Sequence, residues 1–446
     1  MRKNLSALII TPEPAWPVTN GWDVRHSQLI HSMAEFCECD VVTLAPSFVH
    51  VDAGEARRQL GARSFCVVRH SPPLKQIAAL KSLLTSISMG LIMYRSEELR
   101  GAVAALSSQS RYEVCLILGG ICMAGYAFDV KARMQILDMC DDAALNKERR
   151  AQIAGNGAAR AFYRRQAKII RSNLQSASTA CTRILAISEA DAESLSRYVD
   201  VPVVTVPNSV DVGLFHPAQL GVSAPHDPLL LFVGALHSRP NRDAVRWFVS
   251  SVMPLIMHEH PGTRLQLVGP GGEGLAIDCP SVVVRGFADN LAAEYRACDV
   301  FVCPLRVGTG IKNKMMEALS SGCAIVSTDI GTEGLAVRHG EHLLVANDPL
   351  EFAHAVNRLL REPELRKRLG RAARAFAEQS LSSETVRNRL RAAVLPDENL
   401  NESSAREALV QSAVHFSPRS GALCCDALES DPIHQNDELD KIPALP

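Results

Sequence analysis

A glycine-containing loop between two buried-strand patterns constrains the fold of this chain more than any other stretch. Residues 300–304 (VFVCP) are apolar and mostly β-branched or aromatic, and Gly308 and Gly310 occupy the loop that follows. A helical pattern comes next, and then a second β-branched strand at 324–328. A strand, a loop, a helix and a further buried strand in this order predict one unit of a parallel sheet.

The start of that helix is suited to holding phosphate. The loop glycines expose backbone N–H groups beside the positive end of the helix dipole, and Lys312 adds a full charge there. Glu317 is out of phase with the apolar positions Ile311, Met315 and Leu319, so the pattern does not require it in the core. The same glycines also suit a plain tight turn, and the loop alone leaves both interpretations open.

Strand patterns alternate with helical patterns in two successive series. The strands are continuous apolar runs, which is typical of parallel sheets covered on both faces. Polar and glycine residues follow the strand ends, where open α/β sheets bind ligands. The strand patterns lie at 7–10, 41–44, 65–68, 114–118, 135–137, 184–187 and 202–206 in the first series, and at 229–233, 265–268, 282–284, 300–304 and 324–328 in the second.

These two series predict two Rossmann-like, doubly wound α/β domains that face each other across a cleft. A stretch rich in Pro, Gly and His separates the two domains. The C-terminal tail is acidic, with ten Asp or Glu residues against three Lys or Arg, and this composition predicts disorder. The predicted boundaries are 1–207 for the first domain, 208–228 for the linker, 229–380 for the second domain, 381–395 for a helix that returns to the first domain, and 396–446 for the tail.

Composition narrows the class of protein. The net charge is −1, and we expect no nucleic-acid partner. The 13 cysteines contain no Cys-x-x-Cys pair, which indicates a reducing compartment and offers no zinc site. No apolar run reaches the length of a membrane span. We therefore expect a cytoplasmic globular protein without a bound metal or cofactor.

Two strand ends in the first series carry candidate site residues. Asn20 and Gly21 follow the first strand, where the glycine either admits a substrate or completes the turn. Asp138, Asp141 and Asp142 cluster after another strand, and Asp142 is expected to cap the next helix.

Two amphipathic stretches leave a choice between packing and membrane contact. Leu74–Met93 has a broad apolar pattern, for which core packing or a contact between helices is the favoured interpretation. Lining a substrate groove and resting on a membrane are the alternatives. Lys147–Arg171 is a basic helical pattern. It is either a solvated charged face, which is the default, or a peripheral contact with an anionic membrane at its cytoplasmic side.

A series of short motifs in the second half is specific when the motifs are taken in order. They are Val206–Asp211, Phe232–Leu236 with Pro240 and Asn241, Leu267–Gly269, Gly286 with Phe287, Asp299–Pro304, Gly308–Ala318 and Gly331–Leu335. In this order they resemble the glycosyltransferase family 4 (group 1) enzymes of the GT-B fold, strongly over roughly 205–380 and more weakly over 1–205. The resemblance implies a retaining hexosyltransferase of bacterial polysaccharide or glycoconjugate biosynthesis. It implies a nucleotide-diphosphate sugar as donor and a glycan or lipid-linked molecule as acceptor. The sequence shows neither a DxD-type metal motif nor a His/Cys cluster, so we expect no metal.

The resemblance also implies donor contacts. Glu317 resembles the second glutamate of the family's E-x7-E motif, which binds the donor ribose, whereas the first would fall at Thr309 and is missing. This matches a subgroup in which the backbone of Gly308 and Gly310, together with Lys312, holds the diphosphate. Lys312 would then act as a catalytic group by stabilising the leaving diphosphate.

The resemblance also implies contact residues outside the glycine loop and its helix. Gly286 and Phe287 resemble the segment whose backbone contacts the base, and Gly234 closes the donor domain's first strand. The family's phosphate-binding Arg and Lys would fall near Ala235 and Asn241, neither of which is a cation. Lys312 would therefore have to balance more of the negative charge of the diphosphate. In the first domain the implied positions are Asn20 and Gly21, at the acceptor and phosphate loop, and Asp138 or Asp141, which would face the reacting sugar as a catalytic group.

Two alternative functions remain open. A sugar-nucleotide epimerase has the same fold, and a catalytically silent nucleotide-sugar-binding protein would explain the missing counterparts at Thr309 and Ala235.

Overall fold

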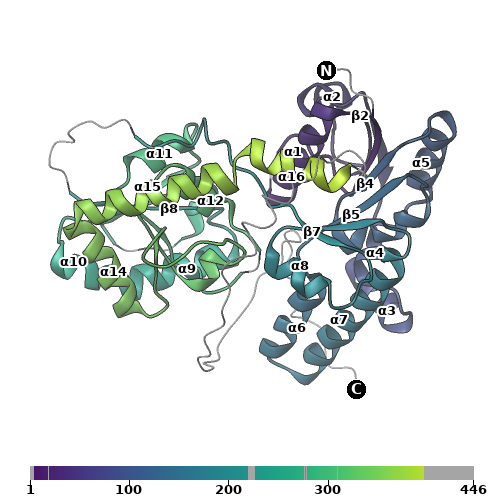
Figure 1. Ribbon diagram of the computed structural model, residues 1–446. Coiled ribbons are helices and arrows are strands. Elements are labelled where there is room, and N and C mark those ends of the chain that lie inside the picture. Colours follow the sequence, from purple (N-terminus) through teal and green to yellow (C-terminus); the bar gives the residue numbers. More distant parts are fainter. Residues whose placement is uncertain are drawn as a thin grey trace.

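The chain forms two parallel β-sheets, each covered by helices (Figure 1). The computed structural model describes residues 5–18, 20–218, 227–275, 277, 279–308 and 310–395. The predicted acidic tail, residues 219–226 of the predicted linker and Thr309 lie outside the described residues. Within the described part of the chain, no helix combines the length and apolar character needed to cross a membrane.

The first sheet has seven parallel strands in the order β3-β2-β1-β4-β5-β6-β7. Because the order reverses beside β1, the loops after β1 and β4 diverge at a topological switch point, where such sheets bind ligands. The strands are β1 (Leu5–Thr11), β2 (Cys37–Pro46), β3 (Ser64–His70), β4 (Val114–Ile117), β5 (Met134–Cys140), β6 (Arg183–Ala186) and β7 (Val203–Thr205).

Helices cover both faces of this sheet over two hydrophobic cores. The helices are α1 (Gly21–Phe36), α2 (Ala53–Leu60), α3 (Lys75–Leu84), α4 (Met89–Met93), α5 (Glu97–Gln109), α6 (Ala143–Ile153), α7 (Gly157–Ser178) and α8 (Glu189–Leu195), with short 3₁₀ turns η1 (Gly120–Cys122) and η2 (Ala124–Phe128).

The prediction of one basic helix over Lys147–Arg171 was wrong, because two helices share this stretch. Helix α6 ends before Gly155, and the side chain of Asn156 caps α7 by accepting from the Ala159 amide at 2.7 Å. Glycine and an N-cap residue in succession favour a break here. The predicted cap at Asp142 is confirmed, because its Oδ1 accepts from the amides of Ala144 and Leu145.

The second sheet has six parallel strands in the order β10-β9-β8-β11-β12-β13. They are β8 (Leu229–Val233), β9 (Arg264–Val268), β10 (Val282–Gly286), β11 (Val300–Cys303), β12 (Ile325–Ser327) and β13 (Leu344–Val345). The covering helices are α9 (Arg239–Trp247), η3 (Phe248–Val252), α10 (Met253–Glu259), η4 (Gly272–Gly274), α11 (Leu291–Ala297), α12 (Asn313–Ser320), α13 (Asp329–Thr332), α14 (Pro349–Arg361) and α15 (Pro363–Ser380).

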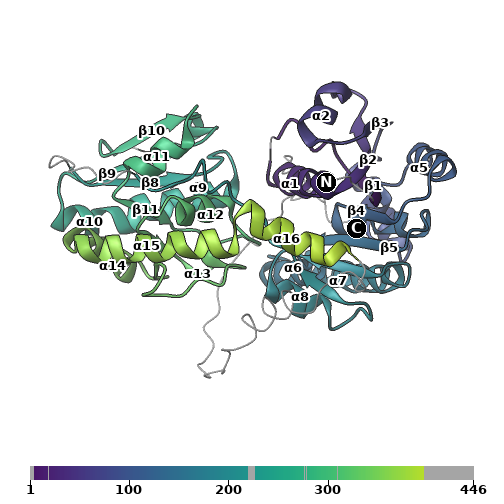
Figure 2. The same cartoon turned by 45° about the horizontal axis from the view of Figure 1, so that its top comes forward.

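The last described helix, α16 (Ser383–Val394), connects the two halves (Figure 2). It follows α15 of the second domain, yet Val386, Leu390 and Ala393 are buried in the core that also contains Leu29 and Met33 of α1. The chain therefore crosses between the domains twice, once before β8 and once between α15 and α16.

Candidate active site

The loop between β11 and α12 has the backbone that its glycines allow. Gly308 and Gly310 have φ angles of 138° and 71°, in the region that favours glycine. Lys312 follows as the N-cap residue of α12, with extended backbone. The strand, loop and helix predicted from this stretch are confirmed, and the loop lies at the carboxyl end of a central strand.

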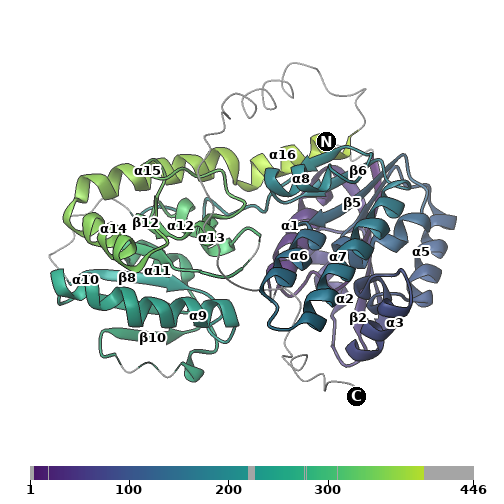
Figure 3. The same ribbon diagram turned by 90° about the horizontal axis from the view of Figure 1, so that it is seen from below.

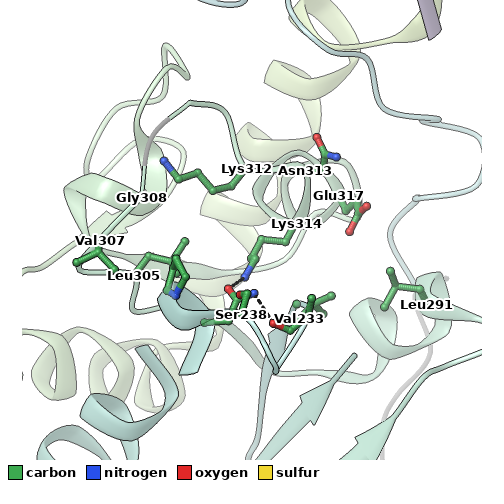
Figure 4. A pocket seen from close by; sticks show the side chains of 14 residues that line it. Val233, Ser238, Leu291, Leu305, Val307, Gly308, Lys312, Asn313, Lys314 and Glu317 are labelled. Carbon is green, nitrogen blue, oxygen red and sulfur yellow. Dashed lines mark hydrogen bonds between the residues drawn. The ribbon is translucent and has the colours of Figure 1, made fainter. Parts of the chain in front are cut away.

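A cavity of about 380 Å³ opens at this edge of the second sheet (Figure 4). The end of β8, the start of α9, the loop after β11 and the first turns of α12 surround it. Its lining residues are Val233, Gly234, Ala235, Ser238, Pro240, Asn241, Leu291, Leu305, Val307, Gly308, Lys312, Asn313, Lys314 and Glu317.

Lys314 places its ammonium group on the floor of this cavity. Its Nζ donates to Asn241 Oδ1 at 2.7 Å and lies 4.2 Å from the centre of the Phe232 ring. Burial lowers the pKa of Lys314 from its ordinary value of 10.5 to about 8. Gly234 makes room for the group, because a Cβ there would lie 2.7 Å from the Lys314 Nζ. A buried ammonium with one side-chain acceptor, open to a cavity, is suited to meet an anion.

Glu317 follows Lys314 by one turn of α12 and lines the same cavity. Its Oε2 accepts from the Tyr295 hydroxyl at 2.7 Å. Burial raises the pKa of Glu317, and the hydrogen bond from Tyr295 and the charge of Lys314 oppose this rise. The cavity thus presents a cation and a carboxylate side by side, and the carboxylate keeps a second oxygen as acceptor.

Lys312 points in another direction from the same helix start (Figure 4). Its Nζ donates to the Gly310 carbonyl at 2.6 Å and lies 3.4 Å from Glu333 Oε2. Arg149, from α6 of the first domain, donates to the other oxygen of Glu333 at 2.5 Å. Burial lowers the pKa of Lys312 as well. The glycine loop is therefore tied to the first domain through one carboxylate.

A smaller cavity of about 50 Å³ lies between the two domains at this point. The first domain contributes Asp141, Leu145, Asn146, Arg149, Ser188, Ala190 and Asp191, and the second contributes Gly310, Glu333 and Gly334. Asp141 accepts from Asn146 Nδ2 at 2.9 Å. The structure therefore brings Asp141 and Gly310, two of the residues predicted from sequence, to one place.

Asp138 has a different environment. Its side chain is fully buried and accepts two hydrogen bonds from Arg25, at 2.9 Å from Nε and 2.5 Å from Nη2. Arg25 also donates to the Val206 carbonyl and to Asn208, whose amide reaches Asn313 at the start of α12 at 3.3 Å. Asp138 lines neither cavity and holds a buried network instead.

The remaining predicted residues, Asn20, Gly21, Gly286 and Phe287, are not among the residues that line the two cavities. Asn20 is the N-cap of α1, and accepts from the Trp22 and Asp23 amides; a Cβ on Gly21 would meet nothing within 4 Å. The Gly286 carbonyl accepts from the Gly269 amide at 2.7 Å, and the Phe287 side chain is exposed.

Sequence reasoning missed Lys314, Arg149 and Glu333. The signal for Lys314 was present, since it precedes Glu317 by three residues and so shares a helix face with it. The pairing of Arg149 with Glu333 joins residues from different domains, and no local pattern marks such a pair.

Known proteins match this chain in sequence and in fold. Residues 227–362 match the family model described as Glycosyl transferases group 1. An uncharacterized 44.6 kDa protein in the cps region of Klebsiella pneumoniae is 25% identical over 208 residues, which cover 44% of this chain and 52% of that protein. A D-inositol 3-phosphate glycosyltransferase of Frankia alni is 30% identical over 243 residues, 47% of this chain and 58% of that protein. The chain thus spans about half the length of these curated relatives.

Solved structures share the whole fold at low sequence identity. Sucrose-phosphate synthase from Thermosynechococcus elongatus superposes with a TM-score of 0.62 at 14% identity, over 92% of this chain and 100% of that one. The Anabaena protein HepE in complex with UDP superposes with a TM-score of 0.61 at 13% identity, over 87% and 99%. The chain has the GT-B fold, and residues 227–362, within its second domain, match the group 1 glycosyl transferases.

Proposed function

We propose that the chain is a glycosyltransferase that moves a sugar from a nucleotide-diphosphate donor to a glycan or a lipid-linked acceptor. The observation that carries the proposal is the pair Lys314 and Glu317 in the cavity of the second domain, a buried ammonium group beside a buried carboxylate. A nucleoside diphosphate offers the matching groups, because its phosphates suit the ammonium and its ribose hydroxyls suit the carboxylate. The HepE complex with UDP supports this choice of ligand.

In this proposal the donor extends across the cavity. Glu317 accepts from the ribose, Lys314 and Lys312 hold the diphosphate with the backbone of Gly308 and Gly310, and Gly234 leaves room for the phosphates. The backbone of Gly286 and Phe287 meets the base. The sugar then points to the cavity between the domains, where Asp141 faces it and the loop at Asn20 and Gly21 lies on the acceptor side.

The chemistry requires charge stabilisation more than covalent participation. The leaving nucleoside diphosphate gains negative charge in the transition state, and fixed cations aimed at that charge lower the barrier. Two ammonium groups at the start of α12 support a metal-independent reaction, and the family resemblance supports retention at the anomeric carbon. A chelator should then leave the rate unchanged, and the product's anomeric proton coupling should match that of the donor.

The biological setting is part of the proposal. Relatives named for the cps region and for a spore coat support a role in bacterial polysaccharide or glycoconjugate assembly. We place the enzyme in the cytoplasm, at the inner face of the membrane, with Lys147–Arg171 as its basic segment.

Incubation with a panel of labelled nucleotide sugars tests the proposal. Transfer, or slow hydrolysis of one donor, supports a glycosyltransferase. Formation of an epimer would replace it with an epimerase, and binding without turnover would leave a nucleotide-sugar-binding protein.

Glu317→Gln is expected to weaken nucleoside diphosphate binding about ten- to a hundred-fold, since a charge-assisted hydrogen bond is worth roughly 1.5–3 kcal/mol. Glutamine still accepts from Tyr295, so the melting temperature should not change. Because the fold raises the pKa of Glu317, wild-type affinity should fall with decreasing pH earlier than for an ordinary glutamate. Isothermal titration beside Glu351→Gln, on the exposed side of α14, measures both effects; equal affinities would remove Glu317 from the donor site.

Asp141→Asn is expected to lower the transfer rate about a hundred-fold while nucleoside diphosphate affinity stays unchanged, because Asp141 lies in the cavity between the domains and not in the donor cavity. Steady-state kinetics and titration on the same preparation separate the two quantities. Asp200→Asn, at an exposed turn, is the matched control. A rate like that of the wild type would show that the reacting sugar does not depend on Asp141.

A further inference from the structure

Helix α3 turns its large apolar side chains outward. Leu74, just before the helix, and Leu80 and Leu84 within it are 68%, 58% and 77% exposed, whereas Ala78 and Ser82 on the other side are fully buried. A helix on a soluble domain normally does the reverse. The exposed set, which we call the α3 stripe, consists of Leu74, Ile77, Leu80, Leu83, Leu84 and Ile87. Core packing was therefore wrong for these side chains, whereas a contact between helices, the other part of the favoured interpretation from sequence, is present between α3 and α7.

Helix α3, which carries most of the stripe, is attached to α7 by hydrogen bonds. Ser82 accepts from Gln166 Nε2 at 2.7 Å, and the Leu83 carbonyl accepts from Arg165 Nη2 at 2.8 Å. Asn173 donates to the Ser86 carbonyl at 2.8 Å, just after the helix. All three partners belong to α7, so α3 uses its polar side for attachment and leaves the stripe uncovered by the described part of the chain.

The surroundings of the stripe are basic. No Asp or Glu occurs in 56–96, which contains α3, or in 149–188, which contains α7. Lys81 on α3 and Arg160, Arg164 and Lys168 on α7 are exposed. Figures 1 and 3 show α3 beside α7 on the outer side of the first domain, away from the second domain.

We propose that the α3 stripe and the cations of α7 dock the chain on an anionic lipid bilayer. Aliphatic side chains enter the boundary between headgroups and acyl chains, and the cations meet lipid phosphates. This places the apolar contact on α3, outside the basic segment inferred from sequence. A second copy of the chain fits less well, because a symmetric contact through the stripe would bring the same cations together. The proposal does not depend on the transferase activity.

Flotation with vesicles tests the proposal on the full chain. We expect binding to vesicles of equal phosphatidylcholine and phosphatidylglycerol to exceed binding to pure phosphatidylcholine on the order of ten-fold or more. Leu80→Asp with Leu84→Asp should lower it by a similar factor, and Arg164→Glu with Lys168→Glu should remove the preference for phosphatidylglycerol. Leu350→Asp, at an exposed leucine of α14, should bind as the wild type does.

UDP titration and melting curves on the same preparations show whether each variant is folded. If the variant with both Leu80→Asp and Leu84→Asp does not fold, Leu84→Ser replaces it in the same test. Three outcomes would overturn the proposal. They are a wild type that does not bind phosphatidylglycerol vesicles at low salt, a folded stripe variant that binds them equally well, and a dimer in sedimentation that the stripe variant converts to monomer without any vesicle binding.

Discussion

Lys314→Met is expected to weaken nucleoside diphosphate binding by two to three orders of magnitude, because one cation about 4 Å from a phosphate contributes roughly 4 kcal/mol at an effective dielectric near 20. Methionine keeps the length of the side chain and removes a buried charge, so the melting temperature should stay or rise. Isothermal titration with UDP measures the loss. Lys367→Met, at an exposed lysine of α15, is the matched control.

The pH dependence of binding gives a second measure of Lys314. Its pKa in the free protein is lowered to about 8, so the ammonium form that suits a diphosphate predominates below pH 8 and is lost above it. UDP affinity should therefore fall as pH rises through this range, and the Lys314→Met variant should not show this fall. An affinity that stays constant in the wild type would contradict the role of Lys314.

A relocated charge provides the sharpest test of position. Asn241 Oδ1 lies 2.7 Å from the Lys314 Nζ and stands where the family resemblance expects a phosphate-binding lysine. Asn241→Lys in the Lys314→Met background should restore part of the affinity. Failure of this rescue together with a strong effect of Lys312→Met would assign the diphosphate to Lys312 alone.

Arg25→Met is expected to destabilise the first domain by about 3–5 kcal/mol, since it leaves the Asp138 carboxylate buried without its cation. Urea unfolding followed by circular dichroism measures this loss. The double variant Arg25→Met with Asp138→Leu should recover most of it, because removing both charges costs far less than removing one.

Arg197→Met, which breaks an exposed ion pair on the surface of the same domain, should leave the unfolding midpoint unchanged. If Arg25→Met instead unfolds like the wild type and loses transfer activity, Asp138 belongs to the reaction and not to the buried network.

Local patterns were sufficient to predict the two sheets and the loop before α12. Continuous apolar strands separated by helices can only be buried in a parallel sheet, and glycines before a helix produce the same exposed amides in almost any context. The strand at Val300–Cys303, the loop around Gly308 and Gly310, and the helix containing Glu317 therefore follow from residues close together in the chain.

The choice between Asp138 and Asp141 could not be made from sequence. A register shift in β5 lies between Asp138 and Cys140, and Cys140 has a φ of 60°. The shift sends Asp138 into the core against Arg25 and Asp141 to the cavity between the domains. Sequence shows three carboxylates after a strand, but not the bulge that separates them.

Contacts between distant residues likewise required the tertiary structure. Lys314 meets Asn241 across 73 residues of sequence, and Arg149 meets Glu333 across 184. For α3, the sequence shows apolar residues at helical spacing but not which side of the helix the domain covers. Periodicity is a property of one segment, and so the sequence determined the elements and their order. Burial, charge pairing and the exposed side of a helix depend on what packs against that segment, and only the tertiary structure decided them.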